Sequence, residues 1–323
     1  MPETVAVIIV NYNGGELLQR CLQALSEQTR QADRVLLVDN NSDNFSADQI
    51  KTSFPWLEVI EFTENTGFAV ANNRAVEKLT DMEWVVLLNP DAYAAQDWLE
   101  NLLAGAKNHS DYLFFGCRML AVENNRLDGT GDVYHVSGAN WRRDYGKSAD
   151  RRKQSGEILS PSGAAALFRR DIYLEAGGFN EEFFCYMEDV DLGLRLQLLG
   201  YRCFYLADAI VTHEGSGVVG KYSDFQVYYG HRNQVWVYLI NMPSPWIWIY
   251  LPQHLLYNVA SVILFMLRGK TRVILRSKID AIKGFPEAWK KRKEVQSGSR
   301  ISSAELRKKM SRGFFTPYIN RNE

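Results

Sequence analysis

Short hydrophobic runs alternate with helical patterns over the first hundred residues. Four runs indicate β-strands, at residues 5–10, 34–39, 57–62 and 84–89, and three of them are almost continuously apolar. Such strands are typical of a sheet that helices cover on both faces. Between the runs, apolar side chains recur every three or four residues, as on one face of a helix. The alternation predicts an α/β fold with a mostly parallel central sheet, flanking helices and right-handed crossovers.

The middle of the chain is less regular. Residues 121–158 are polar and without clear pattern, which indicates a loop or flap that orders on substrate binding. Residues 188–200 predict a short helix, because acids occupy its first turn and Gly200 stands at the stop position. Residues 201–215 predict one or two strands that end at His213.

The most apolar segment of the chain lies at residues 246–267. Its length approaches the roughly 20 residues needed to span a bilayer, but polar residues interrupt it, and His254, Asn258 and Ser261 share one helical face. We therefore expect a helix that lies in a membrane interface, with the basic side chains just beyond it meeting lipid phosphates. A packed or dimerising helix, and hence a homodimer, is one alternative, and a true span is the other.

The net charge of −1 hides a strong asymmetry. Residues 268–323 contain 16 Lys and Arg against 5 Asp and Glu, a balance of +11, so residues 1–267 carry −12. An acidic body with a basic tail predicts that the tail meets an anionic surface, either membrane lipid or nucleic acid. A solvated helical face is the alternative. The tail has few interleaved aromatic residues, which disfavours nucleic acid.

The four cysteines, Cys21, Cys117, Cys185 and Cys203, lie among apolar neighbours and show no C-x-x-C or metal-like spacing. We interpret them as reduced core residues. The first apolar run leads straight into a polar motif rather than a cleavage site, so we expect no secretion signal. Together with the basic tail, these features predict a cytoplasmic protein that is peripherally associated with the inner membrane.

Polar side chains follow three of the predicted strands at the point where each strand ends. Asn11 and Tyr12 follow the first strand, Asp39 closes the second, and Asn89 and Asp91 follow the fourth. Ligands bind at the carboxyl ends of the strands in parallel sheets. Packing does not readily explain three polar strand ends on one edge, so we expect a ligand site there.

Asp39 is a candidate for contacting a nucleotide base. An ionised carboxylate accepts a hydrogen bond from the imide N–H of uracil or thymine, although capping of the following turn is an equal alternative. The turn at Gly67 begins a helix whose backbone N–H groups suit an anion, with the amides of Asn72 and Asn73 nearby. No Gly-Lys-Ser/Thr follows, so this is not a Walker loop.

Asp91 is suited to a hard divalent cation whose other ligands are diphosphate oxygens and water, as is common for magnesium. The ion would neutralise the charge that develops as a nucleoside diphosphate leaves. His213, at another strand end, is the candidate second ligand, and its nitrogen tilts the preference towards manganese. A histidine satisfied within the structure is the competing interpretation. We therefore expect Mn²⁺ or Mg²⁺ as the cofactor.

Three acids within four residues, Glu188, Asp189 and Asp191, cluster at a predicted helix start. The helix dipole and the free N–H groups lower the pKa of a carboxylate at that position and keep it ionised. A base that takes a proton from an attacking hydroxyl must be ionised. The alternative is that all three are ordinary acids of a helix N-terminus. The aromatic turn GGFNEEFFCYM directly before them favours a function.

Six motifs, in this order, resemble the family 2 glycosyltransferases and, more narrowly, their bacterial rhamnosyltransferase-like branch. They lie within about residues 5–215 and read VIIVNYNG, VDNNSxD, NTGFAVANN, LLNPDA, GGFNEEFFCYMEDVDLGLRL and THEGSG. The stretch YYGHRNQ and the basic tail also look like that branch. The resemblance implies a GT-A fold and an inverting transfer of a sugar from a nucleoside diphosphate to an acceptor hydroxyl.

The resemblance also implies a role for each candidate residue. The residues expected to contact the nucleotide sugar are Asn11, Tyr12, Asp39, Gly67, Asn72, Asn73 and Asn89. The metal would be held by Asp91 and His213. Asp189 would be the general base, with Glu188 and Asp191 supporting it or the acceptor. The broader family more often has Asp at the position of Asn89, and an uncharged amide there would weaken metal binding.

We expect a GT-A catalytic domain at residues 1–225, with a nucleotide-binding half (1–92) and an acceptor half (93–225). Residues 226–323 would form a helical, basic, membrane-associating region. The expected reaction moves L-rhamnose from dTDP-rhamnose to a polyprenyl-diphosphate-linked or polysaccharide acceptor of the cell envelope. A UDP-sugar donor remains open.

Two further alternatives come from other classes of protein. A sugar nucleotidyltransferase would need a Gly-rich loop with a catalytic Lys or Arg near the N-terminus, which the stretch VNYNGGELLQR lacks. A non-catalytic nucleotide-sugar binding module would not need Asp189. The Gln-x-x-Arg-Trp motif of processive synthases is also absent, so we expect single additions.

Overall fold

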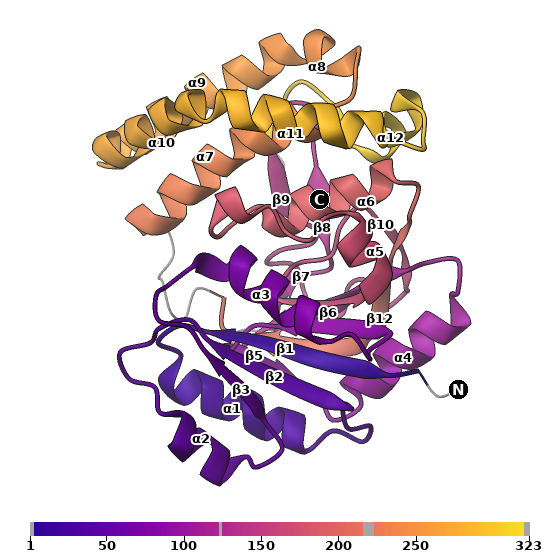
Figure 1. The fold of residues 1–323 in the computed structure, drawn as a ribbon. Helices are drawn as coiled ribbons and strands as arrows, with labels where there is room; N and C mark the ends of the chain where they lie inside the picture. Colours follow the sequence, from indigo (N-terminus) through magenta and orange to yellow (C-terminus); the bar gives the residue numbers. More distant parts are fainter. Residues whose placement is uncertain (1–2, 123–124, 216–222, 320–323) are drawn as a thin grey trace.

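The structure is a computed structural model that describes residues 3–122, 125–215 and 223–319 (Figure 1). A sheet runs through its N-terminal two thirds in the order β10-β12-β6-β11-β4-β1-β2-β3, with β5 beside β12 and β7 beside β6. The strands are β1 (Val5–Asn11), β2 (Arg34–Asp39), β3 (Glu58–Glu61), β4 (Trp84–Leu88), β5 (Ala92–Ala94), β6 (Phe114–Ala121), β7 (Leu127–Gly129), β10 (Gly156–Ile158), β11 (Ala165–Arg169) and β12 (Cys203–His213). The four strands expected near the N-terminus are thus confirmed within a residue or two.

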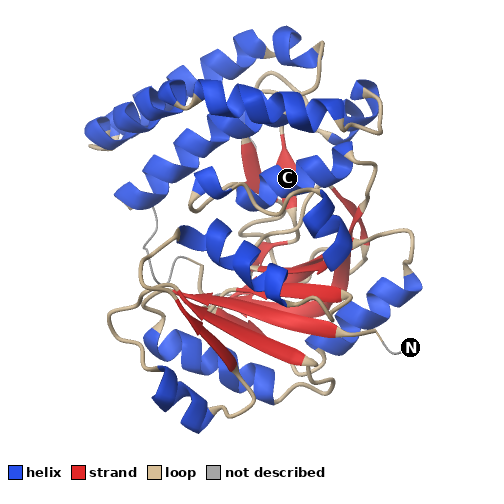
Figure 2. Cartoon of the chain, in the orientation of Figure 1, coloured by secondary structure: helices blue, strands red, loops and turns tan. Residues whose placement is uncertain are grey.

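Helices cover both faces of this sheet (Figure 2). They are α1 (Gly15–Ser26), α2 (Ala47–Ser53), α3 (Gly67–Lys78), α4 (Trp98–Asn108), α5 (Arg170–Glu175) and α6 (Glu188–Leu198). Alternate side chains of β1 enter different cores: Val5, Val7 and Ile9 pack with α1 and α4, while Ala6 and Ile8 pack with α3, α5 and α6. This two-sided burial explains the continuous apolar runs, and the expected α/β architecture is confirmed.

The sheet is mixed rather than purely parallel. β1 pairs parallel with β2 and β4, β2 with β3, and β6 with β12. β11 runs antiparallel between β4 and β6. This insertion brings the start of β11 to the end of β4, where Asn89 N donates a hydrogen bond to Ala164 O at 2.9 Å. The polar end of β4 therefore lies beside the segment that leads into β11.

The expectation of a patternless flap at residues 121–158 is wrong for the part that the structure describes, which leaves out residues 123–124. The segment contains β7, β10 and a two-stranded hairpin of β8 (Asp132–Tyr134) and β9 (Asn140–Arg142). Three-residue strands are too short to show the alternation of apolar and polar residues that identifies a strand. Some of their buried residues are polar, so the hydrophobic pattern does not indicate that they are buried. His135, for example, is fully buried, and its ring nitrogens lie 2.9 Å from Ser137 Oγ and 3.0 Å from Gly313 O.

The C-terminal helices form a layer over α6 and the hairpin (Figure 1). They are α7 (Asp224–Asn241), α8 (Trp246–Ile249), α9 (Leu251–Leu267), α10 (Thr271–Lys283), α11 (Phe285–Ser297), α12 (Ser303–Lys309) and α13 (Thr316–Ile319). Leu194 of α6 shares one hydrophobic core with Trp236 of α7 and Leu306 of α12. Among the residues with described positions, no helix is both long and apolar enough to cross a membrane.

Candidate active site

The carboxyl ends of β1 and β2 hold a fixed carboxylate. Asp39 is buried, and one of its oxygens accepts hydrogen bonds from Asn11 Nδ2 at 2.8 Å and from Ser42 Oγ at 2.7 Å. Its other oxygen accepts one from Ser42 N at 3.0 Å. Each carboxylate oxygen has two lone pairs, so Oδ2 can accept one more hydrogen bond. The neighbouring Tyr12 is exposed and offers a ring for stacking.

The start of α3 is held by a close backbone contact with the turn that precedes α6. Gly67 has a φ of +85°, and a Cβ placed there would lie 2.5 Å from Phe184 O. The same carbonyl accepts a hydrogen bond from Ala69 N at 3.2 Å. A glycine is therefore required for both its conformation and its small size, and the contact joins the start of α3 to the turn before the acid cluster.

The two asparagines of α3 do not point into an open site. Asn72 Nδ2 donates to Phe68 O at 2.9 Å within the helix. Asn73 Oδ1 accepts from Tyr173 Oη at 2.7 Å and from Phe179 N at 2.8 Å, and its Nδ2 donates to Phe179 O at 2.9 Å. Both side chains are buried. In this structure Asn73 anchors the turn before the acid cluster.

Asp91 and His213 lie together, with a third residue that the sequence did not indicate. His213 Nε2 is 3.2 Å from Asp91 Oδ1, and His213 Nδ1 is 2.8 Å from Asp128 Oδ2. Burial lowers the pKa of His213, but hydrogen bonds and charges of the two carboxylates outweigh it and raise the pKa to about 9. Burial raises the pKa of Asp128, yet His213 and Arg142 hold it below its usual range.

This arrangement fits a divalent metal ion. His213 Nε2 is buried and lies 3.2 Å from Asp91 Oδ1, and Asn89 Oδ1, at the end of β4, is buried without a hydrogen-bond partner. Asp128 holds the imidazole by Nδ1, as carboxylates commonly do for histidines that bind metal through Nε2. No group of three His, Cys, Asp or Glu side chains suited to a metal occurs in the described ranges. A metal here would therefore take its remaining ligands from a bound diphosphate and water.

A cleft of about 420 Å³ opens beside His213. Its lining includes Asp128, Glu214, Tyr145 and Arg126. Glu214 N donates to Asp91 O at 3.1 Å, which ties the end of β12 to the turn after β4. His213 thus lines the wall of this cleft, with Asp91 buried behind the same strand end.

Asp189 is the most accessible of the three acids at the start of α6. It is partly exposed, and its Oδ2 accepts a hydrogen bond from Gly163 N at 2.8 Å while Oδ1 accepts one from Val190 N at 2.8 Å. The sequence predicted a lowered pKa, and this is wrong. Burial raises the pKa of Asp189, and the backbone hydrogen bonds oppose the rise without cancelling it.

Glu188 lies beside Asp189 and is buried, and its Oε2 has no hydrogen-bond partner. Burial, followed by the charge of Asp189, raises the pKa of Glu188 well above its usual value. Asp132 of β8 is similar. Its Oδ2 is buried without a partner, and burial, together with the charge of Asp189, raises its pKa well above normal. Two buried carboxyl groups with raised pKa values thus accompany the partly exposed Asp189.

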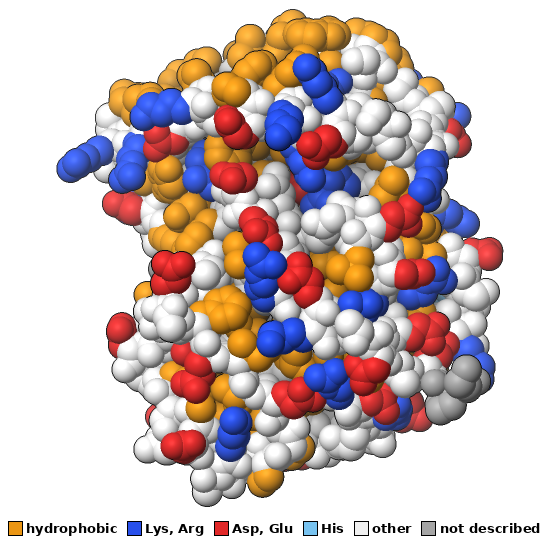
Figure 3. All heavy atoms as spheres, in the orientation of Figure 1, with side chains coloured by type: hydrophobic (Ala, Val, Ile, Leu, Met, Phe, Trp, Pro, Cys, Tyr) orange, Lys and Arg blue, Asp and Glu red, His pale blue; other side chains and the backbone are white. Residues whose placement is uncertain are grey.

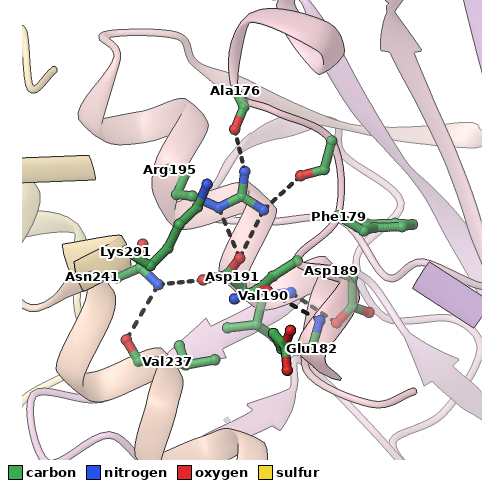
Figure 4. A network of polar contacts seen from close by, with 12 residues as sticks. Ala176, Phe179, Glu182, Asp189, Val190, Asp191, Arg195, Val237, Asn241 and Lys291 are labelled. Atoms are coloured by element: carbon green, nitrogen blue, oxygen red, sulfur yellow. Dashed lines mark hydrogen bonds and ion pairs between the residues drawn. The ribbon is translucent and has the colours of Figure 1, made fainter. Parts of the chain in front are cut away.

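Asp191 faces away from Asp189 and into the interior (Figure 4). It is fully buried, and Arg195 Nη2 and Nε lie 2.7 and 2.8 Å from its Oδ2. Asn241 Nδ2 of α7 donates to Asp191 Oδ1 at 2.7 Å. The structure therefore does not place Asp191 beside the partly exposed Asp189; Asp191 joins α6 to α7.

Asn233 of α7 supports the turn before the acid cluster. Its side-chain amide donates to three carbonyls, those of Phe183, Cys185 and Tyr186, at 2.9, 3.0 and 2.7 Å. Phe184, Tyr186 and Met187 have positive φ values, of 63°, 69° and 74°. Non-glycine residues hold such conformations only where their surroundings enforce them. In the sequence, Asn233 stood out only as part of the stretch YYGHRNQ. Its role in holding the turn was not indicated.

The family model of Glycosyl transferase family 2 matches residues 6–177. The N-acetylglucosaminyl-diphospho-decaprenol L-rhamnosyltransferase of Mycobacterium tuberculosis is 26% identical over 306 residues, covering 88% of this chain and 99% of its own length. The O-antigen chain rhamnosyltransferase RfbN of Salmonella typhimurium is 26% identical over 253 residues, covering 75% and 74%.

Among solved structures, GalNAc-T7 with UDP, GalNAc and Mn²⁺ has a similar fold, with a TM-score of 0.63 at 14% sequence identity. The match covers 80% of this chain but only 51% of that one, so the chain spans about half the length of this structural neighbour.

Proposed function

The chain belongs to glycosyl transferase family 2, and we propose that it transfers L-rhamnose from dTDP-rhamnose to a hydroxyl of a lipid-linked glycan. At the coarser level it is a glycosyltransferase with a GT-A fold that acts in nucleotide-sugar transfer for glycan synthesis. The observation that supports the proposal is that the fixed carboxylate Asp39 lies at the ends of β1 and β2, while Asp91 and His213 lie together at the ends of β4 and β12.

The nucleotide would lie across the ends of β1 and β2. Asp39, fixed by Asn11 and Ser42, accepts the imide N–H of thymine, and the exposed Tyr12 lies beside the base. Uracil carries the same imide, so a UDP-sugar is the second candidate donor. The diphosphate would then extend along the start of α3 towards Asn89 and Asp91.

Asp91 and His213 would hold a divalent ion, Mn²⁺ or Mg²⁺, and Asp128 would orient the imidazole. When bound, the ion supplies charge neutralisation for the nucleoside diphosphate as it leaves. GalNAc-T7, which has the same fold, was crystallised with Mn²⁺. The chain's own contribution is to fix the two ligands before the donor arrives.

Asp189 would act as the general base. It takes the proton from the acceptor hydroxyl as that oxygen attacks the anomeric carbon on the face opposite the leaving diphosphate. One displacement of this kind inverts the configuration at the anomeric carbon. The raised pKa of Asp189 strengthens it as a base. The raised pKa of the neighbouring Glu188 favours its protonated form, which would donate a hydrogen bond to the acceptor. We assign Asp191 a positioning role, because Arg195 and Asn241 occupy its carboxylate.

The acceptor would be a polyprenyl-diphosphate-linked glycan, by analogy with the decaprenol-linked substrate named for the mycobacterial relative. We place the catalytic domain at residues 1–225 and a membrane-associating region at 226–323, and we propose that the protein works at the inner face of the cytoplasmic membrane. The basic charge of the C-terminal region supports this placement.

A donor panel tests the proposal. Purified protein is incubated with dTDP-rhamnose, UDP-N-acetylglucosamine, UDP-galactose or GDP-mannose, and release of the nucleoside diphosphate is measured with Mn²⁺, Mg²⁺ or EDTA. We expect release of dTDP that requires acceptor and metal. Faster turnover of a UDP-sugar than of dTDP-rhamnose would show that the donor is a UDP-sugar. Undiminished turnover in EDTA would show that the reaction does not require a metal.

A further inference from the structure

The C-terminal helices expose an unusual amount of apolar surface. Among the described residues, fifteen of the twenty large apolar side chains that are exposed follow residue 245. On α9 they form one face, composed of Leu255, Leu256, Val259, Ile263, Met266 and Leu267, and Leu267 is 82% exposed. Contiguous apolar surface of this kind marks an interaction site rather than ordinary solvent exposure.

The orientation of α9 is fixed by polar contacts on its opposite face. His254 and Ser261 are buried, and His254 Nδ1 lies 2.8 Å from Ser137 O of the segment between β8 and β9. Asn258 Oδ1 accepts a hydrogen bond from Lys278 Nζ of α10 at 2.7 Å. The polar face of α9 is thus satisfied inside the protein, and its apolar face points outward, the reverse of an ordinary surface helix.

The neighbouring α10 continues this surface and adds positive charge. Leu275, Ile279 and Ile282 are exposed at helical spacing, and Ile282 is 73% exposed. Exposed basic residues flank them, namely Arg268, Arg272, Arg276 and Lys283. In Figure 3, hydrophobic side chains gather along the upper edge of the molecule, over the region where Figure 1 places α8 and α9, with Lys and Arg side chains below. Trp248 of α8 is also exposed there.

We propose that this face, made of α8, α9 and α10, docks on an anionic phospholipid membrane. The apolar side chains would enter the acyl boundary, while the flanking basic residues meet lipid phosphates. α9 has 17 residues, about 25 Å of helix, and would lie along the surface. The proposal deepens the proposed function by naming the surface that brings the enzyme to a lipid-linked acceptor, but membrane binding itself does not require turnover.

The charge pattern favours lipid over a second copy of the chain. A two-fold interface pairs the same patch with itself, so the basic residues beside Leu275 and Ile279 would face one another. Juxtaposed like charges oppose such a contact. A phospholipid surface offers instead an apolar layer beneath a layer of phosphate, which matches an apolar face bordered by Lys and Arg.

Docking would also orient the acceptor site. The inner face of α9 contacts the β8–β9 hairpin, where Tyr257 packs with Ala139 and Trp141. The same hairpin begins with Asp132, whose carboxyl group is close enough to Asp189 for their charges to interact. The membrane-facing helix and the acceptor half of the site are therefore joined through one two-stranded element.

Vesicle flotation tests the proposal with the full chain. Wild-type protein should float with vesicles of phosphatidylglycerol and phosphatidylcholine at 50 mM NaCl, and both pure phosphatidylcholine and high salt should weaken binding. The double variant Ile263→Ser/Leu267→Ser and the double variant Arg268→Glu/Arg272→Glu should each bind at least about tenfold more weakly. Leu174→Ser and Lys51→Glu/Lys107→Glu, on other surfaces, are the matched controls and should bind as the wild type does.

Light scattering after size exclusion distinguishes lipid from self-association. A dimer that Ile263→Ser/Leu267→Ser converts to monomer, with no flotation of the wild type, would overturn the proposal. Failure to float while dTDP-rhamnose is still turned over with a water-soluble acceptor would overturn docking alone. Normal flotation without any turnover of dTDP-rhamnose would leave docking in place and reject the proposed donor.

Discussion

His213 Nδ1 lies 2.8 Å from Asp128 Oδ2, while its Nε2 faces Asp91 at 3.2 Å. One side of the imidazole is thus held by a buried carboxylate, and its other nitrogen faces Asp91. This relationship assigns Asp128 a positioning role that no local sequence pattern indicates. It also fixes His213 next to Asp91, the other residue that we propose as a metal ligand.

Asp128→Asn should weaken metal binding. The amide cannot hold the imidazole as the carboxylate does, and loss of such a partner typically lowers metal affinity about 10- to 100-fold. Mn²⁺ binding in the presence of dTDP, followed by electron paramagnetic resonance, is the measurement. Asp208→Asn, an exposed acid on β12, is the control. Unchanged Mn²⁺ affinity in Asp128→Asn would show that Asp128 does not support the metal site.

Asn233→Ala should damage both stability and turnover. The change leaves three turn carbonyls without their donor, which should lower the free energy of unfolding by about 2–3 kcal/mol. Because the turn leads into Asp189, we expect kcat to fall about tenfold while the affinity for dTDP stays nearly constant. Urea unfolding and initial rates measure the two effects. Asn101→Ala, on α4, is the control. An equal loss of kcat in Asn101→Ala would show that Asn233 has no specific positioning role.

Asp191→Asn should destabilise the fold far more than a matched surface change. The buried Arg195 would lose its counter-charge, and breaking a buried pair typically costs about 3–5 kcal/mol. The control is Asp171→Asn, which breaks the exposed pair with Arg169 and should cost less than about 1 kcal/mol. Urea unfolding compares them. Equal effects in the two variants would mean that Asp191 is not the structural link between α6 and α7.

Two buried histidines should each contribute a loss of stability as the pH drops from about 6.5 to 4. Burial lowers the pKa of His254 and of His135 to about 4, so in this window the unfolded chain binds protons that the folded protein does not. The contribution of each histidine is full above pH 6.5 and is lost towards pH 4, by about 3 kcal/mol for each histidine.

The groups that face His254 are Lys278 of α10, whose pKa burial lowers to about 7, and the stacked Tyr238 of α7. Both titrate above this window, so they do not change the contribution of His254 between pH 4 and 6.5. Urea midpoints across this range should show a shallower slope for His254→Gln than for the wild type. An unchanged slope would mean that His254 is protonated in the folded state.

The sequence predicted the sheet well because each strand is indicated by a hydrophobic run within its own few residues. The runs at β1, β2 and β4 are apolar on both faces, and each side of β1 enters its own core. The short strands between residues 125 and 158 were missed, since three residues carry no periodicity. Residues 246–267 were correctly expected to be helical, but only the structure shows that His254 and Ser261 face inward.

Site residues were harder to assign, because their roles depend on partners far away in the chain. Asp191 and Asn73 look like site residues in their motifs. In the structure, however, the side chain of Asp191 accepts a hydrogen bond from Arg195, and that of Asn73 accepts one from Tyr173. Asp128 was missed because its partner His213 is 85 residues away. Asp189 was expected to have a lowered pKa from its helix position, but burial depends on packing that no local pattern reveals.

The central claim, that Asp189 is the base of an inverting rhamnosyl transfer, is tested most directly by Asp189→Asn. The substitution keeps the size of the side chain and its hydrogen bond from Gly163 N, but it removes the group that takes the proton. Turnover of dTDP-rhamnose with a polyprenyl-diphosphate glycan and Mn²⁺ is measured beside dTDP binding by calorimetry. We expect kcat to fall by about 10²- to 10⁴-fold with dTDP affinity nearly unchanged. Substantial turnover in the variant would contradict the assignment.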